Sequence, residues 1–212
     1  MFAGTLSDHA QKTLALLGKS GLTDKAYLAG GSALALYFGH RYSIDFDFFT
    51  LEQFEPKKLA EKFKKIGNFK QTVAKGISLA GEFNEIKLSY FQYDYPLIGK
   101  LKKFRDVNIA SIEDIAAMKI VAITDRGIKR DFVDLFEIIR QGSDLDKIFK
   151  YYDNKYKAFK ENQYSIIRSL QYFDDAEETE MPKMIKPIVW DEVKEFFIKE
   201  TIRLAKKEGI TD

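Results

Sequence analysis

Two carboxylates inside an aromatic segment are the residues of this chain best suited to chemistry. Asp45 and Asp47 alternate with Phe46 and Phe48 in the stretch 44–50. This alternation is typical of a β-strand, on which alternate side chains share one face about 6.6 Å apart. Two such carboxylates repel each other, and a divalent cation resolves the conflict. The pair therefore predicts a site for Mg²⁺ or Mn²⁺; the alternative is two solvated aspartates on an edge strand.

A glycine turn precedes the carboxylates. Gly30 and Gly31 follow a short strand candidate at 26–29 and open an apolar helical run, with Ser32 as a possible N-cap. The first N–H groups of a helix lack partners within the helix and carry partial positive charge, so they favour a phosphate. The Ser32 hydroxyl adds a possible donor to a phosphate oxygen. Such a turn is common by itself, but followed by a two-carboxylate metal site it indicates nucleotide binding.

The composition sets the broad class of protein. The chain has 212 residues, 45% hydrophobic and 31% charged, which is typical of an ordered protein with one large or two small domains. The net charge of +2 excludes a generally basic surface, so any nucleic-acid contact must be local. Cysteine is absent, which fits a reducing compartment, and no stretch approaches 18 apolar residues. We expect a cytoplasmic protein without a signal peptide or a membrane segment.

The hydrophobic pattern predicts a small α/β domain followed by a helical region. The first part should hold helices at 8–18 and 56–66, with two or three strands between 69 and 93. Beyond about residue 100, the predicted helices lie at about 113–125, 131–140, 144–160, 163–173 and 190–207. We therefore expect an α+β fold with a core at 1–105 and a helical region at 106–212 packed on that core.

Together these motifs resemble a known superfamily. Gly30-Gly31-Ser32 followed by Asp45-x-Asp47 is similar to the first motif of DNA polymerase beta-like nucleotidyltransferases. A closer resemblance is to the AbiEii/AbiGii toxin family of nucleotidyltransferases. Five segments resemble its pattern in the right order: LAGGSALAL, GHRYSIDFDFFT, IKLSYFQYDYPL, KRDFVDLFEII and KPIVWDEVKEFF.

The resemblance implies a polymerase beta-like core with a small mixed sheet and a mainly helical C-terminal part. It also implies transfer of a nucleoside monophosphate from an NTP, with release of pyrophosphate and with metal bound by Asp45 and Asp47. In a type IV-like toxin–antitoxin (abortive infection) system, the acceptor would be RNA, such as a tRNA 3′ end. A cognate antitoxin protein would restrain the enzyme.

The sequence departs from the superfamily at one position. Many polymerase beta-like enzymes carry a third acid on a later strand, and the corresponding residue here is Ser89. Lys87 shares its strand face and is a candidate nucleotide-binding residue, whereas Glu85 lies about 13 Å back along the strand. Three explanations stay open: two carboxylates and a lysine suffice, Asp131 or Asp134 completes the site, or the protein is a degenerate nucleotide-binding module.

A lysine interrupts the apolar stripe of the helix predicted at 113–125. Lys119 lies one turn from both Ile115 and Ile123, where it needs either a stem that reaches solvent or an anionic partner. The resemblance places a functional lysine here, which would neutralise triphosphate charge in the transition state. Arg126 continues the same line and is a candidate nucleotide-binding residue.

Other charged positions have both a structural and a functional interpretation. Asp131 and Asp134 fall near the start of a predicted helix, where acids favour the helix dipole. Asp131 belongs to the family motif, and its functional role would be a contact to metal, to substrate or to Lys119. Arg41 precedes the carboxylate strand and could bind a phosphate or brace Asp45.

Three functions are compatible with these residues. The first is the RNA-modifying toxin, for which the basic and aromatic stretch 147–160 is a candidate RNA-contacting face. The second is a small-molecule, antibiotic-type nucleotidyltransferase with the same core chemistry and another acceptor. The third is a non-catalytic nucleotide-binding module, which the serine at position 89 suggests.

Overall fold

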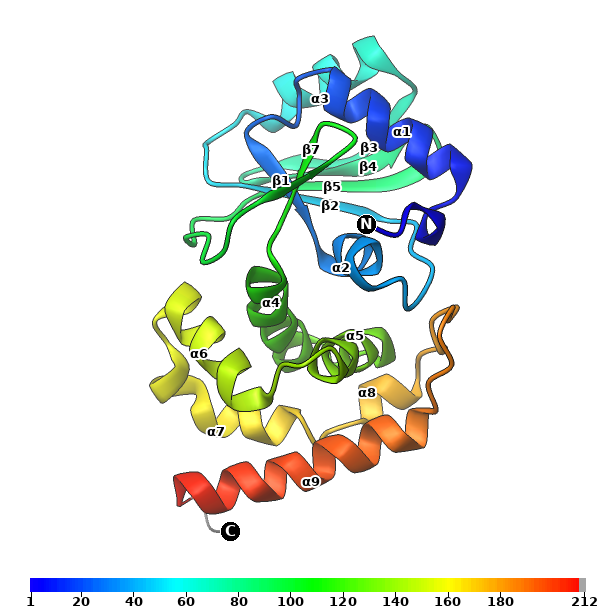
Figure 1. The fold of residues 1–212 in the computed structure, drawn as a ribbon. Helices are drawn as coiled ribbons and strands as arrows, with labels where there is room; N and C mark the ends of the chain where they lie inside the picture. Colours follow the sequence, from blue (N-terminus) through cyan, green and yellow to red (C-terminus); the bar gives the residue numbers. More distant parts are fainter. Residues whose placement is uncertain (210–212) are drawn as a thin grey trace. The chain divides into compact units, whose positions relative to one another are not determined.

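The chain divides into two compact units in the computed structural model, which describes residues 1–209 (Figure 1). The first unit is Met1–Ser111 and the second begins at Ile112. The hydrophobic pattern had placed the boundary at 105/106. The first unit extends further because strand β7, Val107–Ile109, pairs in parallel with β1, Ala26–Ala29. No described helix is long and apolar enough to cross a membrane.

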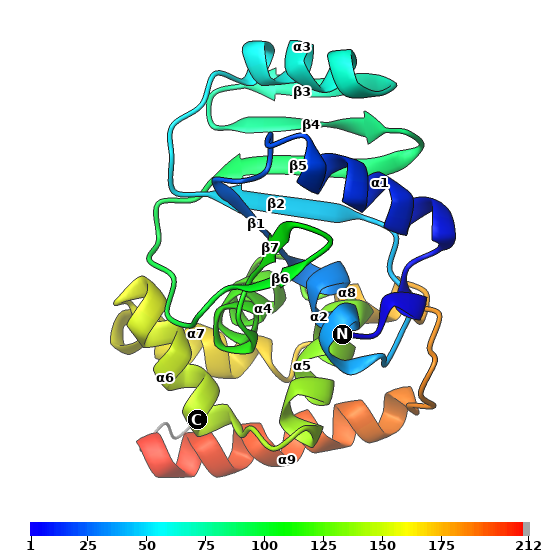
Figure 2. The ribbon, with the colours of Figure 1, turned by 45° about the horizontal axis from the view of Figure 1, so that its top comes forward.

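A seven-stranded mixed sheet forms the centre of the first unit and confirms the predicted fold class (Figure 2). The strand order is β3-β4-β5-β2-β1-β7-β6. β2 runs antiparallel to β1 and parallel to β5, so it lies in the interior of the sheet. The remaining strands are β2 Phe46–Thr50, β3 Phe69–Lys75, β4 Ser78–Phe83, β5 Ile86–Gln92 and β6 Lys102–Phe104.

Two helices cover one face of this sheet. α1, Asp8–Lys19, and α3, Pro56–Ile66, lie over the same face in Figures 1 and 2. The ring of Phe63 on α3 lies 5.4 Å from that of Phe69 and 5.7 Å from that of Phe83. Burying one such phenylalanine stabilises the fold by about 2 kcal/mol. The opposite face of β2 and β5 carries the candidate site.

The second unit consists of helices, as predicted. Phe132 lies at the centre of its aromatic core, with ring centroids 5.1 Å from Phe173, 5.9 Å from Trp190 and 5.4 Å from Phe197. These contacts join segments far apart in the sequence into one core. The helices are α4 Ile112–Asp125, α5 Lys129–Arg140, α6 Leu145–Tyr156, α7 Phe159–Ser169, α8 Asp174–Glu177 and α9 Trp190–Glu208.

Several boundaries differ from the predicted ones. Residues 102–109 form the β6–β7 hairpin, which the hydrophobic pattern did not indicate because each strand has only three residues. The helix expected to reach residue 160 ends at Tyr156, because Lys157 adopts a left-handed backbone conformation with φ of +54°. The next helix consequently begins at Phe159 rather than at 163.

Candidate active site

β2 holds Asp47 on the face of the sheet opposite α1 and α3 (Figure 1). Phe46 and Phe48 are fully buried on the face that α1 and α3 cover, while Asp47 is partly exposed. The register sets Asp47 opposite Ala29, the last residue of β1, and opposite Ser89 of β5. The predicted alternation is therefore present, and Ser89 occupies the sheet position beside Asp47.

Asp45 lies immediately before β2 rather than inside a strand that starts at residue 44. Its backbone carbonyl accepts a hydrogen bond from the Ser32 hydroxyl. The oxygen of Ser32 also lies 2.9 Å from the hydroxyl oxygen of Ser43. Because one hydroxyl proton serves one acceptor, Ser43 donates this second bond. Ser43, which sequence reasoning did not select, thus helps fix the chain that carries Asp45.

The expectation that Ser32 is an N-cap is wrong. Helix α2, Gly30–Phe38, begins two residues earlier with Ala29 in the N-cap position, and no side chain caps it. Ser32 lies in the first turn, and its hydroxyl ties that turn to the segment before β2. The backbone N–H groups at the start of the helix are not bonded within the helix, as a phosphate-binding turn requires.

Both glycines are required by close neighbours. Gly30 has a left-handed φ of +66°, and a Cβ there would lie 3.2 Å from Oδ2 of Asp47. A Cβ at Gly31 would lie only 2.1 Å from Nη2 of Arg41. Arg41 is 5% exposed and donates from Nη1 to the carbonyl oxygen of Tyr42 at 3.0 Å. The first turn of α2 therefore lies between a carboxylate and a guanidinium group, so Arg41 braces this turn, whereas its expected contact with Asp45 stays a prediction.

The neighbouring strand supplies a lysine and a hydroxyl. Lys87 is exposed and lies two residues before Ser89, so both share the sheet face of Asp47. Within residues 1–209 no group of three or more His, Cys, Asp or Glu side chains could hold a metal ion. The protein can thus offer a cation two carboxylates here, and its other ligands must be water or substrate oxygens.

The second unit gathers its predicted site residues into one ionic cluster, in which the Arg126 side chain is 52% exposed and the other members are buried. Nζ of Lys119 lies 2.9 Å from Oδ1 of Asp131 and 2.6 Å from Oδ2 of Asp134. Arg126 donates from Nε to Oδ2 of Asp131 at 2.9 Å and from Nη2 to Oδ1 at 3.1 Å. The two carboxylates are fully buried and the Lys119 side chain is 6% exposed. The predicted contact between Asp131 and Lys119 is present, and it joins α4 to α5.

The charges of this cluster determine the protonation of Asp131. Burial by itself raises the pKa of the Asp131 carboxyl group. The positive charge of Lys119 and the hydrogen bond from Arg126 outweigh burial, so the pKa of Asp131 lies below its ordinary value. The carboxylate is therefore charged at neutral pH, and the ionic cluster is complete.

A second buried ion pair was not anticipated. Nζ of Lys155 lies 2.8 Å from Oδ1 of Asp114, and both side chains are fully buried. The sequence contained a usable signal, because Ile148, Tyr152 and Lys155 are spaced i, i+4 and i+7 along the buried stripe of α6. A lysine in such a stripe predicts a buried partner, by the same reasoning that applies to Lys119.

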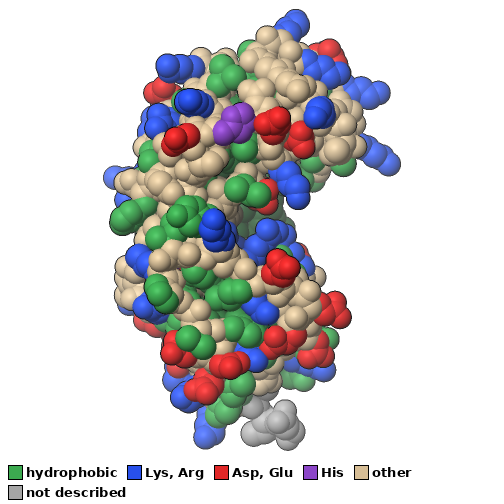
Figure 3. Space-filling model, turned by 90° about the vertical axis from the view of Figure 1, so that its right-hand side faces the viewer, with side chains coloured by type: hydrophobic (Ala, Val, Ile, Leu, Met, Phe, Trp, Pro, Cys, Tyr) green, Lys and Arg blue, Asp and Glu red, His purple; other side chains and the backbone are tan. Residues whose placement is uncertain are grey.

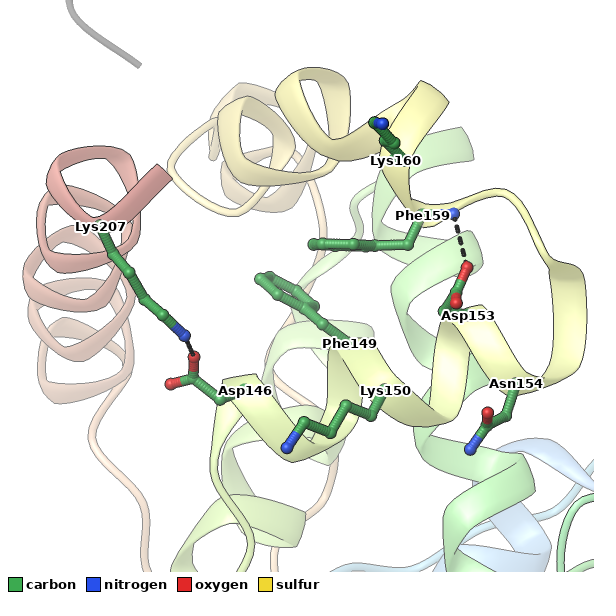
Figure 4. A pocket seen from close by; sticks show the side chains of 8 residues that line it. All are labelled: Asp146, Phe149, Lys150, Asp153, Asn154, Phe159, Lys160 and Lys207. Atoms are coloured by element: carbon green, nitrogen blue, oxygen red, sulfur yellow. Dashed lines mark hydrogen bonds and ion pairs between the residues drawn. The ribbon is translucent and has the colours of Figure 1, made fainter. Parts of the chain in front are cut away.

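The stretch 147–160 contributes to a hollow of about 500 Å³ shown in Figure 4. The rings of Phe149 and Phe159 lie 4.7 Å apart and pack on each other. Lys150 and Lys160 project on opposite sides of this ring pair (Figure 4). The rings of Phe149 and Phe159 are thus occupied by internal packing, and the exposed residues of this stretch are mainly charged.

Charged side chains of both signs are interspersed over each unit on the face drawn in Figure 3. This distribution agrees with a formal net charge of +2. Recognition of a polyanion must therefore use a local group of cations rather than the field of the whole surface.

A mixed sheet with a carboxylate beside the glycine-opened N-terminus of a helix is suited to binding a phosphate together with a cation. The chain belongs to the family described as "Nucleotidyl transferase AbiEii toxin, Type IV TA system", whose model matches residues 13–98 and 77–200. The resemblance seen in the sequence is confirmed, and the protein is a nucleotidyltransferase.

Known proteins similar to this chain include a curated relative and two solved structures. Uncharacterized protein aq_aa25 of Aquifex aeolicus (strain VF5) is 40% identical over 183 residues, covering 84% of this chain and 86% of that protein. JHP933 from Helicobacter pylori has a TM-score of 0.58 at 20% identity, over 95% of this chain and 94% of that one. MenT4, a nucleotidyltransferase toxin from Mycobacterium tuberculosis H37Rv, has a TM-score of 0.53 at 13% identity, over 93% of this chain and 89% of that one. The two structures show that the fold is shared.

Proposed function

We propose that this protein transfers a nucleoside monophosphate from an NTP to RNA, such as a tRNA, as the toxin of a type IV toxin–antitoxin pair in the cytoplasm. The observation that carries the proposal is the approach of Gly30 to Asp47. A Cβ at the first residue of α2 would lie 3.2 Å from the Asp47 carboxylate. A phosphate at the helix N-terminus would therefore lie next to a carboxylate, and that arrangement needs an intervening cation.

The residues present fit a divalent cation, Mg²⁺ or Mn²⁺. Asp45 and Asp47 offer hard oxygen ligands, and glycine at position 30 avoids a Cβ that would lie 3.2 Å from Oδ2 of Asp47. When bound, such an ion screens the triphosphate charge and lowers the pKa of an incoming hydroxyl group. Ser89 supplies a hydroxyl where related enzymes carry an acid, so the proposal relies on two carboxylates.

The side chains of the first unit would bind and orient the NTP. The N–H groups of Gly30 and Gly31 would donate to phosphate oxygens, and Lys87 would add positive charge from the same sheet face. Ser32 and Arg41 would hold this frame through their contacts with Asp45 and Gly31.

The reaction is a displacement at the α-phosphorus of the NTP. The acceptor hydroxyl oxygen forms a bond to that phosphorus, and the bond from phosphorus to the bridging β-phosphate oxygen breaks. Pyrophosphate leaves, and the hydroxyl proton passes to water. Lys119, Arg126 and Asp131 belong to the proposal as well: Arg126, whose side chain is 52% exposed, would offset triphosphate charge, and the buried Lys119 and Asp131 would orient it.

The test combines α-labelled NTP, Mg²⁺ and total tRNA. We expect label in RNA, and a loss of about 100-fold or more in Asp45→Asn and in Asp47→Asn. The exposed Asp24→Asn variant serves as a matched control, which should retain full activity. Melting temperatures of all variants separate loss of activity from loss of fold.

The possible outcomes discriminate among the candidate functions. Label in an added small-molecule acceptor instead of RNA would favour the antibiotic-type enzyme. Undiminished transfer by Asp45→Asn would show that the metal proposal is wrong. Retained nucleotide binding without transfer to any acceptor would favour the binding module.

A further inference from the structure

An exposed ridge on α7 separates two hollows of the second unit. Tyr164 and Arg168, spaced i and i+4, line both of them. One hollow, of about 460 Å³, lies between α7 and α9, and the other, of about 500 Å³, lies between α7 and the ends of α4 and α8. We name this feature, Tyr164 with Arg168, the α7 ridge.

The α7 ridge presents groups that are not used in packing. Tyr164 is 59% exposed, and within residues 1–209 its ring makes no aromatic or cation–π contact. Arg168 is exposed and makes no side-chain ion pair or hydrogen bond in the same range. An open aromatic face next to a guanidinium group that makes no ion pair suits a base followed by a phosphate.

The two hollows differ in charge. The hollow toward α9 adds Lys206 to Arg168 and contains no acidic residue in its lining, so it suits a phosphate. The hollow toward α4 adds Arg126 together with Asp125 and Asp175, and also the half-exposed ring of Tyr172. Carboxylates accept hydrogen bonds from the amino groups of bases, so this hollow suits a base more than a phosphate.

We infer that the α7 ridge binds single-stranded RNA, with one base stacked on Tyr164 and the adjoining phosphate on Arg168. The inference rests on the proposed function, since it assigns the surface that holds the RNA acceptor. Single-stranded RNA fits better than a duplex because only unstacked bases can lie on an aromatic ring. The surface differs from the stretch 147–160, whose Phe149 and Phe159 rings pack on each other.

Direct RNA binding tests this inference without nucleotide transfer. A fluorescein-labelled 12-nucleotide single strand is titrated against the full chain carrying Asp45→Asn, without NTP, and anisotropy is measured. Relative to this parent, adding Tyr164→Ala should weaken binding about 5- to 100-fold, while adding Tyr164→Phe retains it. Adding Arg168→Ala should lower the slope of log affinity against log salt by about 0.7, because one phosphate of the strand is then no longer neutralised.

The matched control removes two exposed lysines from the other candidate surface. Lys150→Ala with Lys160→Ala should change RNA affinity less than twofold. Unchanged binding by Tyr164→Ala, or a larger loss in the lysine variant, would overturn the assignment. Equal affinity for a duplex of the same strand would contradict the proposed stacking of a base on Tyr164. Because the assay contains no NTP, a failure of the enzymatic proposal appears separately, as absent transfer with intact RNA binding.

Discussion

At the residue scale, the site depends on the absence of a side chain at two glycines. Gly31 admits the guanidinium group of Arg41, and Gly30 admits the carboxylate of Asp47. These positions carry different constraints, because only Gly30 also needs a positive φ. Gly31 is limited by space alone, so a substitution there isolates the contact with Arg41.

Gly31→Ala should lower the free energy of unfolding by about 1–3 kcal/mol, because the new Cβ would displace the buried guanidinium group. Urea unfolding followed by far-UV circular dichroism measures the change. Gly4→Ala is the matched control, since a Cβ there meets nothing within 4 Å. Wild-type stability in Gly31→Ala would contradict the bracing role of Arg41.

The spacing of these residues was predictable, and their partners were not. Alternation alone indicated that Asp47 faces away from Phe46 and Phe48. The role of Ser32 could not be read from the sequence, because its acceptor, the carbonyl of Asp45, lies 13 positions away. A hydroxyl near a helix start predicts a cap by local rules, and here a tertiary hydrogen bond prevails.

At the element scale, buried ion pairs add to the apolar contacts between helices. Lys119 joins α4 to α5 and Lys155 joins α6 to α4, each through carboxylates with no exposed surface. Periodicity indicated that Lys119 needs either a stem that reaches solvent or an anionic partner, and Asp131 of the next predicted helix was a candidate for that partner. The β6–β7 hairpin escaped the same reasoning, because three-residue strands are too short to show a period.

Because of the Asp131 carboxylate, we expect the stability of the second unit to fall at acid pH. Its pKa is lower in the folded chain than in the unfolded one, where an aspartate has a pKa of about 3.9. Its contribution is therefore complete above that value and is lost as pH falls through the folded pKa. We expect Asp131→Asn to cost about 3 kcal/mol at pH 7 and progressively less below pH 4.

Fluorescence of the single tryptophan, Trp190, reports this unfolding, because its ring packs in the core of the second unit. Urea midpoints measured from pH 7 to pH 3 give the comparison. Asp125→Asn, at an exposed position near the end of α4, should follow the wild type throughout. If the urea midpoints of Asp131→Asn and wild type differed by the same amount at every pH, the lowered pKa of the Asp131 carboxyl group would be contradicted.

At the scale of the whole molecule, the chain contains two cores built from separate stretches of sequence. The first is a sheet with Phe63, Phe69 and Phe83, and the second surrounds Phe132. Composition indicated one large domain or two small ones, and the change from strand to helix periodicity indicated where they divide. The division falls later than predicted because β7 completes the sheet beside β1.

Because the two cores are separate, we expect a destabilising substitution in one unit to loosen mainly that unit. Hydrogen exchange of Gly31→Ala, followed by mass spectrometry, should accelerate in peptides from residues 26–50. Peptides from residues 112–209 should exchange at the wild-type rate. Equal acceleration in both groups would indicate a single cooperative unit.

The buried lysines have a practical consequence for handling the protein. An amine-acylating reagent can modify the many surface lysines of the native chain, but Lys119 and Lys155 are 6% and 0% exposed. Acylation at those two amines requires the helices to separate first. A brief labelling pulse, read by tryptic mapping, would then count the fraction of molecules in any preparation whose helical half has opened.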